Sequence, residues 1–258
     1  MAGTAISYNS NSLQTDNIIT SDISHESSPT IDAKPMALSH TSQSRIPYVS
    51  YPSKEITISG KVTGSSVADL DSKLDTFRGY LVGKDKNLDI AYAGSTRRYI
   101  ATPTAVRIDR PGGLSFANFQ VTFLCSQPFG QATSDNTVLS ATGRTSSSYN
   151  DSYSFPGSAP EQRPKWTITL TALTGGTDKY IAVGNNATGE QIKITRTWAT
   201  NDVVEIDSAN KTVKVNGTEV DFEGAFPLFG NGSQTLTYLD NLTTRTFNIT
   251  VVNTPLYL

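Results

Sequence analysis

The sequence predicts a mainly β protein of two domains: a β-sheet with one α-helix, followed by an antiparallel β-sandwich. Many short runs alternate apolar and polar residues, which is the period of a strand, whereas one run over residues 66–81 has the period of a helix. A stretch rich in Ser, Gly and Pro separates two groups of strands in the 258-residue chain. We therefore expect a first domain over 1–130, a linker or arm over 131–163, and the sandwich over 164–258.

Residues 1–50 predict short edge strands and loops, because isolated apolar residues stand in a background of Ser, Thr and Asn. Three prolines, Pro35, Pro47 and Pro52, restrict the backbone near the end of this region. They favour an extended segment over residues 35–52 that can reach across to another structure.

A helix is predicted directly after the first strong strand. Ser66 is placed as its N-cap, with Asp69 three residues later, where a short acid can reach back to free amides. Gly83 is expected to stop the helix at the C′ position. The apolar stripe, which needs a sheet to cover it, consists of Val67, Leu70, Leu74, Phe77 and Leu81.

That sheet is expected from strands over residues 56–62, 88–92 and 114–125, where apolar residues recur at every second position. The last of these strands carries the single cysteine, Cys125, which alternates with core residues and is interpreted as a core residue itself. Pro103 implies a break or an edge position in the strand between them.

The second half predicts a sandwich. Short alternating runs begin at "KWTITLTAL" and continue to "TFNITVV", with turn signals between them and no helical period. From Ser126 to about residue 163 the composition indicates no run able to close a core, which is why a linker or arm is expected there.

Composition excludes several classes of function. Charged residues make up 17% of the chain and the formal net charge is -2, which is untypical of nucleic-acid-binding proteins. One cysteine cannot form an intrachain disulfide or a cysteine-rich metal site. The first residues lack a signal-peptide pattern, and no apolar run is long enough for a membrane span. We expect a protein made in soluble form in a cytoplasm.

Two groups of acidic residues were tested as ion or catalytic sites. Asp85, Asn87 and Asp89 resemble the start of a calcium loop, but the required Gly and the bidentate Glu are missing. Glu219, Asp221 and Glu223 project from one face of an expected strand, as a glycosidase pair or ion site requires. A solvated edge that discourages aggregation is the favoured interpretation.

No catalytic machinery is expected. The two histidines, His25 and His40, lie in the polar N-terminal region, so the serines and threonines lack a base that would activate them. We expect no enzyme activity, no catalytic residue, no cofactor and no metal.

The two tryptophans suggest different environments. Trp166 alternates with core residues and is expected to be buried. Trp198, beside Arg196, is the candidate for an exposed ring that contacts a glycan.

A resemblance adds to these expectations. The first half contains "ISYNSNSLQ", "KEITISGKVTGSSVADLDSKLDTFRGYL" and "GGLSFANFQVTFLCSQPFG", and the second contains "RPKWTITLTAL", "GEQIKITRTWATNDVVEIDSANKTVKVNGTEV" and "GAFPLFGNG". In these stretches and their order the chain resembles a siphophage distal tail protein, the baseplate hub or tail-tip ring protein.

The resemblance implies a belt domain that assembles six copies into a ring continuing the tail tube, and a C-terminal sandwich of galectin-like or carbohydrate-module type. The segment 131–163 is longer and richer in Ser than a simple linker, so an arm, a loop of the ring and a part of the sandwich all stay open for it. Its implied location is the tip of the virion tail. The implied partners are the tail tube protein, the tail-associated hub protein and, as an additional partner on the rim, a receptor-binding protein, without a membrane or sequence-specific nucleic acid.

Two alternatives stay open at this point. The chain could be a carbohydrate-binding module that adsorbs the particle to its host, or a tail tube subunit. The second is disfavoured because tube subunits of this kind usually lack a second domain.

Overall fold

A computed structural model describes residues 5–24, 29–34, 36–37, 44–45, 49–92 and 94–258. The chain divides into two units, residues 1–133 with Leu258, and residues 134–257. Each unit has its own hydrophobic core.

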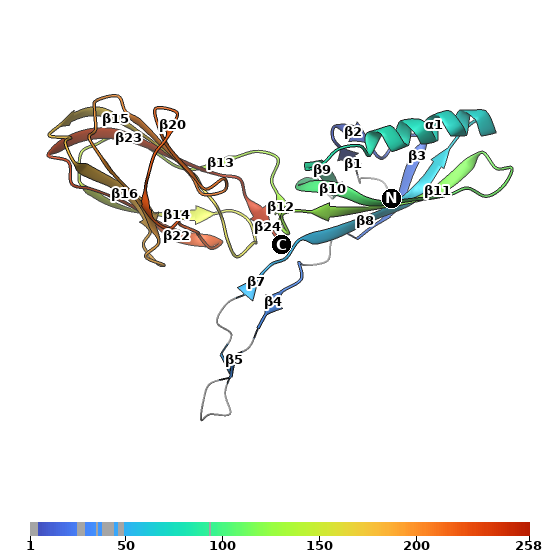
Figure 1. Cartoon of the computed structure of the whole chain (residues 1–258), viewed down its shortest axis with the longest axis horizontal. Helices are drawn as coiled ribbons and strands as arrows, with labels where there is room; N and C mark the ends of the chain where they lie inside the picture. The colour runs from blue at the N-terminus through green and yellow to red at the C-terminus, as the bar shows by residue number, and fades with distance from the viewer. Residues whose placement is uncertain (1–4, 25–28, 35, 38–43, 46–48, 93) are drawn as a thin grey trace. The chain divides into compact units, whose positions relative to one another are not determined.

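The first unit contains an antiparallel sheet with the strand order β2-β1-β9-β10-β11-β8-β3 (Figure 1). A two-residue strand, β12 (Gly130–Gln131), also pairs with β10. The strands of the main path are β1 (Ala5–Tyr8), β2 (Asn11–Ser12), β3 (Ile18–Ile23), β8 (Lys54–Thr63), β9 (Lys86–Tyr92), β10 (Ser95–Asp109) and β11 (Phe116–Cys125).

The three strands expected around the helix are confirmed. They are β8, β9 and β11, and all belong to this one sheet. Alternation along them turns Ile56, Ile58 and Val121 into the core, where each is fully buried. Cys125 is also fully buried, as predicted.

The predicted helix is α1 (Val67–Tyr80), and its N-terminus forms as expected. The Ser66 hydroxyl accepts a hydrogen bond from the Asp69 amide at 3.2 Å, and the Asp69 carboxylate accepts one from the Ser65 amide at 2.7 Å. The placement of Gly83 was wrong. The helix ends at a Leu81 C-cap, so Gly83 lies one residue beyond C′, at a φ of 130°.

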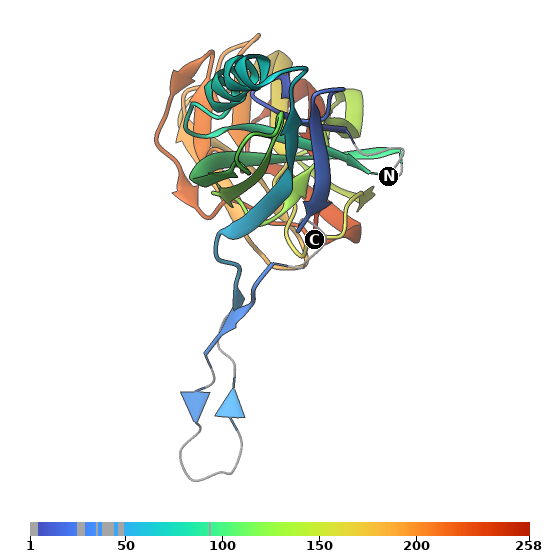
Figure 2. The ribbon, with the colours of Figure 1, turned by 90° about the vertical axis from the view of Figure 1, so that its right-hand side faces the viewer.

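The stripe of α1 packs on β8 and β11. Figure 2 shows the helix on one side of the sheet. Leu70, Leu74, Phe77 and Leu81 are buried, but Val67 is 45% exposed, so its placement in the core was wrong. At 100° per residue, Val67 stands about 50° from the centre of the other four and belongs to the first turn, where the edge of the stripe meets solvent.

Residues 29–53 contain two successive antiparallel ladders. The strand β4 (Asp32–Ala33) pairs with β7 (Val49–Ser50), and β5 (Met36–Ala37) pairs with β6 (Ser44–Arg45). Figure 1 shows β4, β7 and β5 as a narrow ribbon. The expected extended segment is therefore a β-hairpin in its described part, while Pro35 and Pro47 lie outside the described residues.

The second unit is the predicted antiparallel sandwich. One sheet has the order β13-β23-β15-β18-β19-β20 and the other the order β14-β22-β16-β17-β21. The strands are β13 (Asn136–Arg144), β14 (Ser148–Phe155), β15 (Lys165–Thr174), β16 (Lys179–Asn185), β17 (Gln191–Arg196), β18 (Val203–Asp207), β19 (Thr212–Val215), β20 (Thr218–Glu219), β21 (Glu223–Gly224), β22 (Gly232–Asp240) and β23 (Thr244–Asn253). The short β24 (Leu256–Tyr257) follows them.

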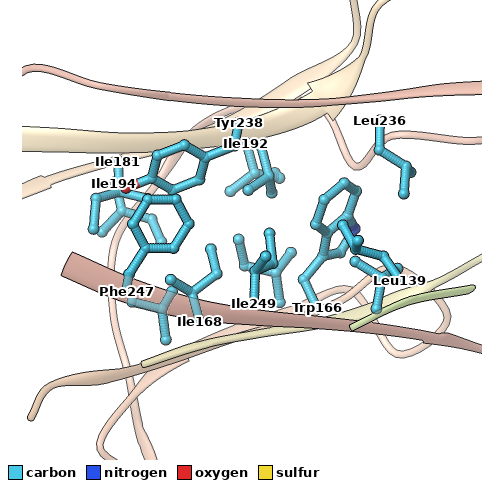
Figure 3. Packing of buried hydrophobic residues seen from close by; sticks show 14 of the residues in the cluster. Leu139, Trp166, Ile168, Ile181, Ile192, Ile194, Leu236, Tyr238, Phe247 and Ile249 are labelled. Atoms are coloured by element: carbon cyan, nitrogen blue, oxygen red, sulfur yellow. The ribbon is translucent and has the colours of Figure 1, made fainter. Parts of the chain in front are cut away.

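The expected linker over 131–163 was wrong. Its residues form β13 in one sheet and β14 in the other, and both strands contribute to the core. Figure 3 shows Leu139 among the same packed side chains as Trp166, Ile249 and Phe247. In β14 the apolar positions are filled by Tyr149, Tyr153 and Phe155, and the serines between them hid the alternation.

Candidate functional site

The sheet of the first unit has two unlike faces. Helix α1 covers one of them, and the Phe77 and Phe119 rings meet there with centroids 4.7 Å apart. The opposite face carries the residues that alternate with the core positions, and they are half-buried or exposed. On β8 and β11 they are Glu55, Thr57, Ser59, Lys61, Asn118, Gln120, Thr122 and Leu124. This face is therefore polar and open to solvent.

An ion pair fixes two strands on the polar face. Arg98 of β10 stands opposite Asp89 of β9 and donates two hydrogen bonds of 2.8 Å to its carboxylate. The hydrogen bonds to Asp89 raise the pKa of the Arg98 guanidinium. Both oxygens of Asp89 are occupied in this way, so this carboxylate stabilises a strand pair and is not a calcium ligand.

The covered face ends in a group of buried polar side chains. Cys125 pairs with Lys54 across β11 and β8, and the Lys54 ammonium lies 5.4 Å from the centre of the Tyr99 ring. Burial raises the pKa of the Cys125 thiol to about 12 and lowers the pKa of Lys54. The thiol is thus kept protonated and unreactive, as a core position requires.

The second half of β10 has a free edge. The ladder with β9 ends at Ala101, and a bulge at Pro103 follows, so the strand from 103 to 109 pairs with β11 alone among the described strands. Of the two expectations for Pro103, the edge position is confirmed, and the break is wrong because β10 continues through Pro103 with only a bulge. Beside this edge, a shallow depression of about 430 Å³ is lined by Arg78, Leu81, Val106 and Ile108. Val106 is 45% exposed.

The strand β3, at the other end of the path β10-β11-β8-β3, is a second edge strand. Within the described residues, β3 pairs with β8 and its outer side has no strand partner. Residues 14–15 satisfy the first part of that side, because Thr15 exchanges hydrogen bonds with the Ile18 backbone and the Gln14 side chain accepts from the Thr20 amide at 2.8 Å. The unpaired stretch of β3 therefore starts beyond the Thr20 amide. Ile19 on this strand is 36% exposed. The sheet therefore offers one unpaired strand segment at each side of its four-strand path.

Charged residues of α1 form ion pairs beside the covered face. Asp71 forms an ion pair with Arg110, and Asp75 forms one of 2.8 Å with Arg78. Asp69 accepts from the Ser65 amide and pairs with Lys73 at 2.9 Å, and these contacts, in that order, lower its pKa to about 2.

The expected sugar-stacking ring at Trp198 was wrong. Its side chain is only 4% exposed and its indole N–H donates to the Lys179 carbonyl at 2.9 Å. The sandwich needs this apolar ring in its own core, so no face is left for a glycan. Trp166 is fully buried, as predicted.

The acidic residues of the second unit lie at an edge. Glu219, Asp221 and Glu223 are all exposed, and Glu223 pairs with Lys193 at 3.1 Å. The favoured interpretation of a solvated edge is confirmed for these side chains. His25 and His40 lie outside the described residues.

In the part of the chain that the structure describes, no cluster of three potential metal ligands is found. No helix there has the length and apolarity that a bilayer crossing requires.

The sequence interpretation missed the free half of β10. The one sequence feature that pointed to it was Pro103 inside a long strand pattern. Pro103 predicted a break or an edge position, but not which neighbouring strand would end there.

Comparisons with known proteins found similarities to both units. Residues 161–253 match the family model of the siphovirus-type tail component, C-terminal domain. No curated protein matches the chain.

Among solved structures, SPP1 Dit (gp 19.1), described as a paradigm of the hub adsorption apparatus in phages that infect Gram-positive bacteria, matches with a TM-score of 0.74 and 16% identity over 99% of both chains. Chains of the phage P2 baseplate in its activated conformation match with a TM-score of 0.48. The Ca form has 9% identity over 97% of both chains, and the Sr form has 10% identity over 96% of this chain and 97% of that one.

The SPP1 Dit match extends over both units, and the family match lies within the second. The expected mainly β class and the resemblance to a distal tail protein are both confirmed. Residues 161–253 are therefore similar to the C-terminal domain of siphovirus-type tail components, and the fold of SPP1 Dit extends over the length of the chain.

Proposed function

We propose that this chain is a structural ring protein of the phage tail tip, in which six copies assemble through their first units. The observation that carries the proposal is the pair of free strand edges at opposite sides of one sheet, β10 beyond Pro103 and β3. An unpaired edge is a template for another strand, and a sheet that leaves two of them is prepared to continue into two neighbours.

Strand direction supports head-to-tail closure. Each neighbour in the path β10-β11-β8-β3 is antiparallel, so β10 and β3 run in opposite directions. Rotation about a ring axis keeps the direction of every strand along that axis. The β10 edge of one copy would therefore meet the β3 edge of the next in antiparallel orientation. The free half of β10 spans residues 103–109, whereas β3 is unpaired only beyond the Thr20 amide, so the next copy would contact that end of β3.

The two faces of the sheet suit such a ring. The apolar face is already covered by α1, and the opposite face is polar and needs no further layer. In a ring the polar face can border a water-filled channel that continues a tail tube.

We further propose that the ring joins the tail tube protein to the tail-associated hub protein, with receptor-binding proteins as additional partners on the second units. Such a role is structural, not catalytic, and the protein would be synthesised in the host cytoplasm before it enters the virion. The burial of Trp198 removes the residue on which the glycan-binding alternative depended. The presence of a full second unit argues against a tail tube subunit.

Native mass spectrometry and light scattering at tens of micromolar test the ring. We expect six copies for the natural chain. Val106→Glu should leave a folded monomer, because it places a charge beside the free edge, where burial in an interface costs roughly several kcal/mol.

Val67→Glu is the matched control, since Val67 has the same side chain and the same 45% exposure but lies on the helix. This variant should still form the ring. A natural chain that stays monomeric, or a Val106→Glu chain that assembles as well as the natural one, would overturn the proposal.

A further inference from the structure

The second unit contains a fork between two of its segments. The strand β21 pairs with β17 at only two positions, Ile192 with Gly224 and Lys193 with Glu223. Residues 219–221, which precede β21, form no ladder with β17. The fork holds an open depression of about 480 Å³. Its lining is Ile194, Thr195, Arg196, Thr197, Glu219, Val220 and Asp221.

The backbone of β17 is unpaired along the fork. The Gln191 carbonyl accepts from the Ala225 amide at 3.0 Å, so position 191 directs its backbone groups toward the β21 side. Backbone groups alternate between the two sides of a strand, so those of Thr195 point to the same side as those of 191. No ladder with β21 reaches Thr195. One amide and one carbonyl of Thr195 therefore face the depression.

The lining of the fork has one more negative than positive charge, from Glu219, Asp221 and Arg196. Glu219 and Asp221 are exposed and form no ion pair within the described residues, although Lys214 stands opposite Glu219 in the β19–β20 ladder. The Arg196 Nε donates to the Thr197 carbonyl at 3.2 Å and its guanidinium lies 5.5 Å from the Trp198 ring centre, so its charge is held beside that ring. The floor is apolar at the buried Ile194 and the half-buried Val220.

We propose that this fork binds an extended, lysine- or arginine-bearing segment of a partner protein as an added strand. Thr195 would supply the main-chain hydrogen bonds, and alternate residues of the segment would meet the apolar floor. The basic residues between them would meet the Glu219 and Asp221 carboxylates. Because the fork lies wholly within the second unit, binding can be measured whether or not the first units form a ring.

A displayed library of random short peptides, selected on the whole chain, tests the site. We expect enriched peptides that alternate apolar and basic residues. The best peptide is then synthesised and titrated by fluorescence anisotropy. Thr195→Pro should weaken its binding about tenfold, because the amide donor is lost and its partner carbonyl is left unpaired. Proline is tolerated there, since this amide faces away from the β16 ladder.

Thr195→Ala is the matched control, because it keeps the amide and removes only the exposed side chain. Its affinity should equal that of the natural chain. The double variant Glu219→Gln, Asp221→Asn should weaken binding by several-fold, and added salt should reduce that difference.

A second readout does not depend on the folding of the proline variant. In NMR spectra of the natural chain, the Thr195 amide should gain protection from hydrogen exchange when the selected peptide binds. Failure to select any peptide, selection of acidic peptides, or an unprotected Thr195 amide in the complex would each overturn the proposal.

Discussion

The two units differ in how the faces of their sheets are covered. In the second unit, two sheets bury their inner faces against each other, and its core includes the stacked rings of Phe155 and Phe229 at 4.8 Å and of Tyr238 and Phe247 at 4.2 Å. In the first unit, one sheet is covered by one helix and leaves a polar face and two free strand segments. The second unit therefore completes its core with its own two sheets, whereas the first unit leaves one whole sheet face uncovered.

The thinner packing of the first unit makes it depend on very few side chains. Leu70, Leu74 and Phe77 are the buried residues of the only helix in the described chain, and Leu81 is buried at its C-cap. The second unit spreads its core over both sheets, as Figure 3 shows for residues of several strands. A single change in the helix should thus separate the two units experimentally.

The largest effect is expected for Leu74→Asp. Leu74 is 2% exposed, and an unpaired carboxylate there should cost roughly 5 kcal/mol or more, enough to unfold the first unit. Calorimetry should then show one remaining transition, from the second unit. Asp75→Lys, one position along at an exposed site, should change stability by about 1 kcal/mol or less despite the loss of its Arg78 pair. If Leu74→Asp left both units folded, the stripe would not be a core and the contrast between the units would fail.

The converse change tests the self-contained second unit. Gln162 is fully buried and joins the chain end to the sandwich. Its amide nitrogen donates to the Leu256 carbonyl at 3.1 Å, and its oxygen accepts from the Leu256 amide and the Asn253 side chain, both at 3.0 Å. Gln162→Met keeps the volume but leaves these groups unpaired.

We expect Gln162→Met to destabilise the second unit by about 2–4 kcal/mol and to leave the first transition unchanged. The measurement is urea unfolding followed separately for each unit. Gln191→Met, at an exposed position of β17, is the control and should change stability by about 0.5 kcal/mol or less. Equal effects of the two substitutions would mean that the buried network contributes nothing.

The sequence predicted the elements whose signals are local. Ser66 and Asp69 define a helix start through contacts within a few residues, and the alternation in β8 and β11 defines their inner faces. The sandwich was likewise readable from its repeated short strands. These patterns are local because side-chain direction follows directly from backbone period.

The wrong predictions concern residues whose environment depends on segments far away in the sequence. Serines in β14 resemble a linker, and only pairing with β22 makes them the outer face of a sheet. Trp198 resembles a surface ring until its contact with Lys179 is known. The free half of β10 could not be predicted because it is defined by where β9 ends, which sequence period does not reveal.

The smallest effect concerns the helix start in the first unit, where acid should erase a local advantage that the second unit lacks. The Asp69 pKa is about 2, below its usual 3.8, chiefly because the charged carboxylate accepts from the Ser65 amide and secondly because of Lys73. A group whose pKa is depressed by folding stabilises the folded state above the unfolded pKa and loses that contribution as pH falls through the folded pKa.

The unfolding temperature of the first unit should therefore be slightly higher in the natural chain than in Asp69→Asn near neutral pH. The difference should shrink below about pH 4 and be small at pH 2, where about half of the folded Asp69 carboxylates are still charged. The second transition should be the same in both chains at every pH. Calorimetry across this range measures both, and a difference as large at pH 2 as at neutral pH would show that Asp69 acts through its shape and hydrogen bonding rather than its charge.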